Sequence, residues 1–217
     1  MVKSKVALIS SAMILCICMS FYFPFPNNKT IDARASFMML PIRDQDGYVV
    51  LGIIGSFLFI LAMILLGIGL RKYRVRTMII VVLIYSFLPT LLITMYQETL
   101  AKGIAAISYD GSGTCQFDNV SEDLLNGECS LVLLNRSSES VSFELEFIDS
   151  FSPEDEVRME SLMNLNGPHK FTIEGNSEEM IEVNELLDLT DVPNHVDSGT
   201  SMNIHIKLVE GEDIRIL

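Results

Sequence analysis

Three long apolar runs, each without a charged residue, lie within the first 96 residues of this chain. They cover residues 6–23, 48–70 and 77–96. An α-helix rises about 1.5 Å per residue and the hydrocarbon core of a bilayer is about 30 Å thick, so about 20 apolar residues cross it. The runs therefore predict three transmembrane α-helices.

Charge is divided along the chain in the same way. Residues 1–96 hold 9 Lys and Arg against 3 Asp and Glu, a net charge of +6, whereas residues 97–217 hold 6 against 25, a net charge of −19. This division excludes a single soluble domain, a disordered chain and a nucleic-acid-binding protein. It predicts a basic membrane domain over residues 1–102 and an acidic domain over residues 103–217.

The first run also has features of a signal peptide, because Lys3 and Lys5 precede it. However, the sequence continues after Phe23 with Pro-Phe-Pro instead of a cleavage site of small residues, and Ala33-Arg34-Ala35 lies far downstream. We expect an uncleaved helix, and cleavage remains the alternative.

Basic residues predict the orientation of the helices. Besides the two lysines before the first run, the turn between the second and third runs contains Arg71, Lys72, Arg74 and Arg76. Cytoplasmic loops next to transmembrane helices carry an excess of basic residues. We therefore expect a multi-pass protein of the cell membrane with a cytoplasmic N-terminus and an extracytoplasmic domain at residues 103–217.

Small residues and a proline interrupt the apolar runs. Gly52 and Ser56 have the spacing that allows close helix packing, although glycine is also common in membrane helices for other reasons. Pro89 predicts a bend in the third helix, because proline lacks a backbone donor. The absence of charged residues and histidine from the runs argues against an ion-coupled transporter acting alone.

Residues 103–217 have the pattern of an all-β domain. Apolar and polar residues alternate over 141–147 and 202–208, as in strands with one buried face. Shorter strands are predicted at 104–109, 114–117, 129–134, 170–173, 181–183 and 213–216. Turns are predicted at Asn126-Gly127 and at other Gly- and Ser-rich segments. Short strands at this density suggest a β-sandwich.

One short helix is expected to interrupt the strands. Ser152 can cap it, Pro153 suits its first position, and Asn166-Gly167-Pro168 ends it. On this helix Val157, Met159, Leu162 and Met163 are expected to face the core.

The segment from Cys129 to Phe147 is a strand ending in Leu-Asn, a Ser-rich turn and a strand of the form Val-x-Phe-x-Leu-x-Phe. It resembles immunoglobulin-like or fibronectin-like domains. The resemblance implies a β-sandwich, and such sandwiches share no single function.

Cys115 and Cys129 are the only cysteines of the acidic domain. Disulfides persist outside the cytoplasm, so we expect these two to be bonded. Two reduced cysteines in the core are the alternative.

Residues typical of catalysis or metal binding are sparse. The three histidines, His169, His195 and His205, lack metal-ligand spacing, and His205 falls on the polar face of its predicted strand. No nucleophile elbow, phosphate loop or dinucleotide motif occurs. We therefore expect no catalytic residues, metal site or cofactor.

Together these features predict a non-enzymatic integral membrane protein. Its outer domain would bind a protein, or act as an accessory or sensory part of a membrane complex. One alternative is a small accessory subunit of a membrane transport system, and another is a membrane-anchored hydrolase or metal-dependent enzyme. The expected partners are the lipid bilayer and a membrane or extracytoplasmic protein, but not nucleic acid.

Overall fold

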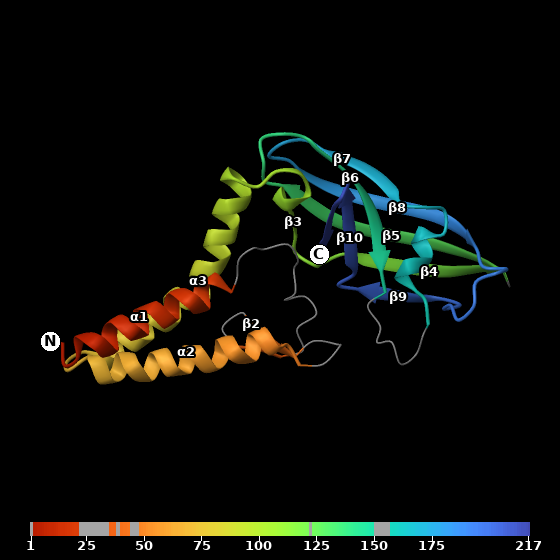
Figure 1. The fold of residues 1–217 in the computed structure, drawn as a ribbon. Coiled ribbons are helices and arrows are strands. Elements are labelled where there is room, and N and C mark those ends of the chain that lie inside the picture. Colours follow the sequence, from red (N-terminus) through yellow and green to blue (C-terminus); the bar gives the residue numbers. More distant parts are fainter. Residues whose placement is uncertain (1, 22–34, 38–39, 44–47, 122, 150–156) are drawn as a thin grey trace. The chain divides into compact units, whose positions relative to one another are not determined.

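Residues 2–21, 35–37, 40–43, 48–121, 123–149 and 157–217 are described by the computed structural model of the chain. Their contacts divide the chain into two units, one mainly helical and one mainly of strands (Figure 1). The boundary in the last helix lies between Thr94 and Met95.

The helical unit contains three apolar helices. They are α1 (Lys5–Ser20), α2 (Val50–Gly69) and α3 (Arg74–Thr99). Within the described residues, α2 and α3 are long and apolar enough to cross a membrane, whereas α1 has 16 residues and is shorter than that limit. The end of the first predicted helix, residues 22–23, lies outside the described residues.

A small hairpin that the sequence did not predict precedes α2. Its strands are β1 (Ala35–Phe37) and β2 (Leu40–Arg43), which pair antiparallel. The ring of Phe37 packs edge-on against the ring of Phe59 in α2, with 5.9 Å between the centroids.

Strands form most of the second unit. In chain order its elements are the 3-10 helix η1 (Gly103–Ala106), β3 (Ile107–Tyr109), β4 (Thr114–Ser121), β5 (Leu124–Asn135), β6 (Val141–Ile148), the 3-10 helix η2 (Glu160–Asn164), β7 (His169–Ile173), β8 (Glu178–Asp188), β9 (Gly199–Met202), β10 (His205–Glu210) and β11 (Asp213–Ile216).

These strands form two antiparallel sheets. One has the order β11-β10-β6-β7. The other is built on the long strand β5, which pairs with β8 along one edge and with β3 and then β4 along the other, while β9 pairs with β4. Inward-facing side chains of both sheets share one hydrophobic core, which includes the fully buried Leu125, Leu133, Leu145, Phe147 and Ile206. The alternation predicted for 141–147 is confirmed, because Val141, Phe143, Leu145 and Phe147 are all buried.

The turn predicted at Asn126-Gly127 is wrong. Both residues lie inside β5, where they pair with Asp118 and Phe117 of β4. A Cβ atom on Gly127 would lie 2.5 Å from the Sδ atom of Met163. Glycine is therefore used here for the close approach of the η2 segment to the sheet, and not for a turn.

The single strand predicted over 202–208 is also wrong. Met202 ends β9 in one sheet, and His205 begins β10 in the other, with Asn203 at a φ of +57° between them. This change of sheet leaves the side chain of Met202 69% exposed, whereas that of His205 is only 9% exposed instead of lying on a polar face.

The helix predicted to start at Ser152 is replaced, in its described part, by the short 3-10 helix η2; residues 150–156 lie outside the described residues. The Oδ1 atom of Asp149 accepts hydrogen bonds from the backbone N–H groups of Met159 and Ser161. Arg158 instead pairs through its backbone with Asn194 and Val196. These bonds hold residues 158–159 out of a helix. Met159, Leu162 and Met163 are buried as expected, but Val157 is 39% exposed, so its predicted core position is wrong.

Candidate functional site

The segment that follows α3 is held against strands β10 and β11 by hydrogen bonds with buried and partly buried polar side chains. This junction consists of the last turn of α3, η1 and side chains from β10 and β11, and all of it belongs to the second unit. Gly103 opens η1 with a φ of +55°, and a Cβ atom there would lie 2.0 Å from the Oε2 atom of Glu210. The same oxygen accepts a hydrogen bond of 2.9 Å from the backbone N–H of Ile104, so a side chain at position 103 would displace Glu210 from this bond and would be strained by the positive φ.

Arg215 occupies the centre of the junction. Its side chain is buried, with 3% exposure. Its Nη1 atom donates hydrogen bonds to the carbonyl oxygens of Ile104 at 2.6 Å, Ala105 at 3.0 Å and Ile107 at 2.5 Å. The tight 3-10 turn brings these carbonyl groups together, and Arg215 reaches them from β11.

The last turn of α3 reaches the same carbonyl groups. The Nε2 atom of Gln97, which is 3% exposed, donates to Ala105 at 3.3 Å and to Ile107 at 3.2 Å. Glu98 forms an ion pair of 3.3 Å with Arg136, but both side chains are partly exposed. Exposed ion pairs contribute little, so the buried hydrogen bonds of Gln97 and Arg215 are the main polar links of the junction.

Burial also changes the electrostatics of the junction. Removal of water lowers the pKa of Arg215 to about 10, while the neighbouring Tyr96 acts in the opposite direction. The guanidinium group therefore remains protonated at neutral pH. Its charge is stabilised by the oriented carbonyl dipoles around it.

The two cysteines predicted to be bonded form a disulfide in the structure. Cys115 on β4 and Cys129 on β5 are directly opposite in the register, with a Cα–Cα distance of 4.1 Å. Both are fully buried. The disulfide therefore links neighbouring strands of one sheet and not the two sheets to each other.

A row of mostly small residues on α2 faces α1. It recurs every three or four positions and consists of Gly52, Gly55, Phe59, Ala62, Leu66 and Gly69, all buried. The hydroxyl of Ser11 donates to the Ala62 carbonyl at 2.8 Å, and the Sγ atom of Cys18 donates to the Gly55 carbonyl at 3.7 Å. The hydroxyl of Ser56, by contrast, donates to the Gly52 carbonyl within its own helix.

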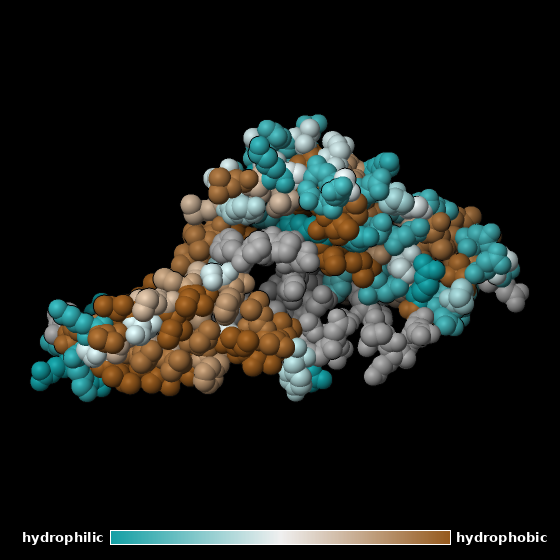
Figure 2. Space-filling view, in the orientation of Figure 1, coloured by the Kyte–Doolittle hydropathy of each residue, from teal (hydrophilic) through white to brown (hydrophobic). Residues whose placement is uncertain are grey.

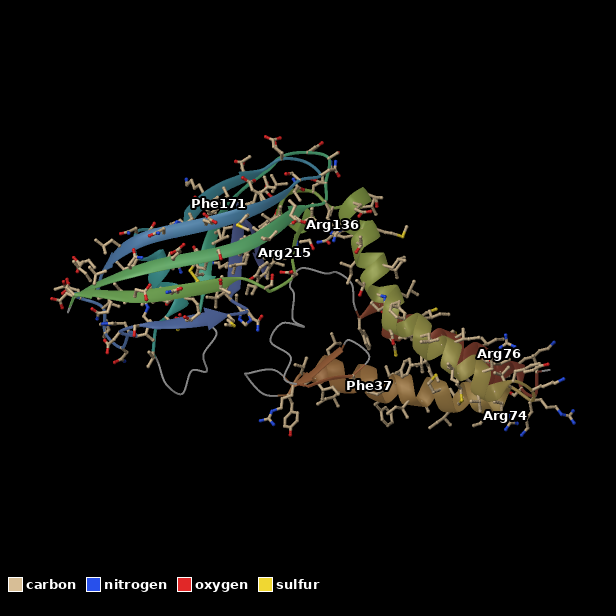
Figure 3. The ribbon with its side chains drawn as sticks, turned by 180° about the vertical axis from the view of Figure 1, so that it is seen from behind. Phe37, Arg74, Arg76, Arg136, Phe171 and Arg215 are labelled. Atoms are coloured by element: carbon tan, nitrogen blue, oxygen red, sulfur yellow. A yellow bond between two sulfur atoms is a disulfide. The ribbon has the colours of Figure 1, made fainter. Side chains whose placement is uncertain are left out.

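Pro89 lies inside α3, which remains continuous but bends along its length (Figure 3). One turn earlier, the Tyr85 hydroxyl donates to the carbonyl of Leu15 in α1. The rings of Tyr85 and Phe59 also pack together, with 5.0 Å between their centroids. These contacts attach α3 to the α1–α2 pair.

The basic residues used to predict orientation are exposed at one end of the helical unit. Arg71 and Lys72 lie in the turn after α2, and Arg74 and Arg76 lie in the first turn of α3. All four side chains are exposed.

The histidines do not come together. His169 contacts the Met163 carbonyl at 2.9 Å and lies 3.6 Å from Glu185, whereas His195 contacts the Val192 carbonyl. Over the part of the chain that the structure describes, no group of three His, Cys, Asp or Glu side chains is placed to hold a metal ion.

Sequence reasoning missed the junction. In the predicted strand 213–216, the apolar Ile214 and Ile216 suggest that their face is buried and that Arg215 is exposed. The structure has the reverse, with both isoleucines exposed and Arg215 buried. The one signal of the junction in the sequence is the glycine at position 103, directly after the third apolar run and its helical extension. This glycine indicates a positive φ but does not indicate that Glu210 and Arg215 lie nearby.

Comparison with known proteins gave no match to a family model, a curated protein or a solved structure.

Proposed function

We propose that this chain is a non-enzymatic integral membrane protein that displays its β-rich unit outside the cytoplasm to bind another protein, as an accessory or sensory part of a membrane complex. The exposure of the helices carries the proposal. Large apolar side chains such as Phe57, Val75 and Phe87 are each about 70% exposed. Figure 2 shows apolar surface over most of the visible helical unit. Lipid would cover such a surface favourably, and water would not.

Three membrane crossings are proposed, with α1 as the first. On its own α1 is short for a bilayer, but its hydrogen bonds to α2 at Ala62 and Gly55 run along the helix pair. The two helices are antiparallel, because the α1 residue later in the chain contacts the earlier α2 residue. Because α1 lies antiparallel along α2, it would cross the membrane in the direction opposite to α2.

The outer unit is proposed to be an immunoglobulin-like or fibronectin-like sandwich. In immunoglobulin domains strands A, B and E share one sheet, and G, F, C and C′ share the other. The orders β4-β5-β8 and β11-β10-β6-β7 follow the same pairing scheme. No described strand takes the place of strand D, and β9 pairs with β4 instead. The same-sheet disulfide also differs from the inter-sheet disulfide of antibody domains.

The orientation has two supports. The basic residues cluster at the turn between α2 and α3, which is the end expected in the cytoplasm. The buried Cys115–Cys129 disulfide fits an oxidising compartment on the other side.

Cross-linking with a membrane-impermeant, amine-reactive reagent tests display and binding together. On intact cells or right-side-out vesicles, Lys170, whose side chain is 79% exposed, should react. The full chain should be joined to a second protein, and a control chain ending at Lys102 should not. Absence of reaction at Lys170 until the membrane is opened would contradict the orientation. Reaction without any protein adduct would contradict the binding function.

A further inference from the structure

Two basic stretches that are far apart in the sequence meet at one end of the helical unit. The backbone N–H of Lys3 donates to the carbonyl of Gly69, at the end of α2, with a distance of 2.7 Å. The N–H of Ser4 donates to the same carbonyl at 3.2 Å, and Val2 pairs with Leu70. The N-terminal lysines therefore lie at the same end as the turn between α2 and α3. The resulting basic end consists of Lys3, Lys5, Arg71, Lys72, Arg74 and Arg76.

Among the described residues of the helical unit, no acidic side chain neutralises the charge of this basic end. All six side chains are exposed. Residues 2–21 and 48–94 contain no Asp or Glu, and the ion pairs of the described residues all lie in the β-rich unit or its junction. Arg74 uses one nitrogen to donate to the Leu70 carbonyl at 2.5 Å. Its other donors, and the guanidinium of Arg76, point away from the helices (Figure 3).

Exposed apolar side chains lie beside these charges. Val6 and Val75 are 75% and 70% exposed, and Tyr73 is 52% exposed. The Nζ atom of Lys72 lies 5.0 Å from the centre of the Tyr73 ring. A tyrosine and aliphatic residues next to lysine and arginine are typical of the depth at which lipid headgroups meet acyl chains.

We propose that the basic end binds the phosphate groups of anionic phospholipids. Guanidinium groups pair with phosphate through two hydrogen bonds, and lysine adds a point charge. The start of α3 at Arg74 contributes the positive end of a helix dipole to the same place. The apolar neighbours favour a lipid over free phosphate, because they contact acyl chains that free phosphate lacks. This inference rests on the proposed membrane location.

The test measures which lipids gather around the full-length protein. The protein is reconstituted into phosphatidylcholine bilayers that contain trace amounts of spin-labelled lipid. The relative association of phosphatidylglycerol over phosphatidylcholine is then measured at low salt. We expect a preference of about fivefold or more, since each basic residue near the surface contributes about that factor.

Two triple variants, each of which removes three positive charges, show which residues cause the preference for phosphatidylglycerol. Arg71→Gln, Arg74→Gln and Arg76→Gln together should reduce the preference for phosphatidylglycerol at least about fivefold, and Lys3, Lys5 and Lys72 should account for what is left. The control Lys29→Gln, Arg34→Gln and Arg43→Gln, placed by the predicted topology across the bilayer, should retain it. Equal loss in both variants, or no preference in the wild type, would overturn the lipid site while leaving the membrane proposal intact.

Two further measurements complete the test. Inorganic phosphate added at constant ionic strength should not release the bound lipid, and release would show that the site takes free phosphate instead. Alkaline extraction should leave the protein in the bilayer. Its removal by alkali would overturn the proposed membrane function and the lipid site together.

Discussion

The phenol group of Tyr109 is fixed inside the β-rich unit by two hydrogen bonds. It donates to the carbonyl of Ile204 at 2.9 Å and accepts from the backbone N–H of Gly113 at 3.0 Å. Burial raises the pKa of Tyr109 to about 12, and the neighbouring Asp110 adds to this effect. The bond from Gly113 lowers the pKa but does not offset the loss of water around the phenol.

In a fragment of residues 103–217, the ionisation of Tyr109 can be measured by ultraviolet absorbance without a contribution from other tyrosines or from tryptophan. Tyr109 is the only tyrosine of residues 103–217, and the chain has no tryptophan. Phenolate absorbance of this fragment should therefore rise near pH 12, whereas in denaturant it should rise near the ordinary value of about 10. Because the folded pKa is raised, the stability contributed by the neutral phenol is complete below about pH 10 and is lost between pH 10 and 12. Ionisation near pH 10 in the folded fragment would contradict the buried position.

At the scale of elements, the packing of α1 against α2 depends on the absence of a side chain at Gly69. A Cβ atom there would lie 2.7 Å from the Cγ atom of Leu8 and 3.1 Å from its backbone nitrogen. At Gly67 a Cβ atom would meet the flexible end of Met78, at 3.0 Å. The two positions are close in sequence but differ in how easily their neighbour can move.

We therefore predict that Gly69→Ala destabilises the helix pair and that Gly67→Ala does not. The overpacking at position 69 should cost about 1–3 kcal/mol, while at position 67 the better helix propensity of alanine, about 1 kcal/mol, should offset a small shift of Met78. Denaturant-induced unfolding in detergent micelles, followed by circular dichroism, measures both. Equal stability of the two variants would show that α1 does not pack against Gly69.

The elements differ in how well the sequence predicts them. Strand β6 was predicted almost completely, because strict alternation reflects burial on one side of the sheet. The break at Asn203 was missed, since Met202, Ile204 and Ile206 continue the same alternation across a change of sheet. Gly127 was misread because a glycine that makes room for a neighbouring segment resembles a turn glycine. These errors share a cause: both depend on which distant segment packs against the strand.

At the scale of the molecule, residues 103–217 have a continuous core of their own. We predict that this fragment folds alone, because a chain of this length can bury enough surface. Far-ultraviolet circular dichroism should show mainly strand, with a cooperative thermal transition. Reduction of the Cys115–Cys129 disulfide should lower the free energy of unfolding by about 3 kcal/mol. A spectrum without structure, or one dominated by helix, would contradict the two-sheet arrangement.

The candidate site was less predictable than the fold. The cysteine pair was found because the expected extracytoplasmic placement of the domain favours a disulfide. The junction was not, because its members come from positions 97, 103–107, 210 and 215, and no local pattern links them. Arg215 in particular is a charged residue whose buried side chain is bonded to the carbonyl groups of the distant η1 segment. Such a position can be recognised only after the sheet order is known.

The position of Arg215 has a consequence for biosynthesis. It follows Ile104, whose carbonyl it binds, by 111 positions. The ribosome therefore completes almost the whole unit before the carbonyl groups of η1 can meet this guanidinium. Strand β10, which pairs with β6, is made only shortly before. The junction next to α3 is consequently among the last parts of the nascent chain to close, although α3 itself emerges from the ribosome long before.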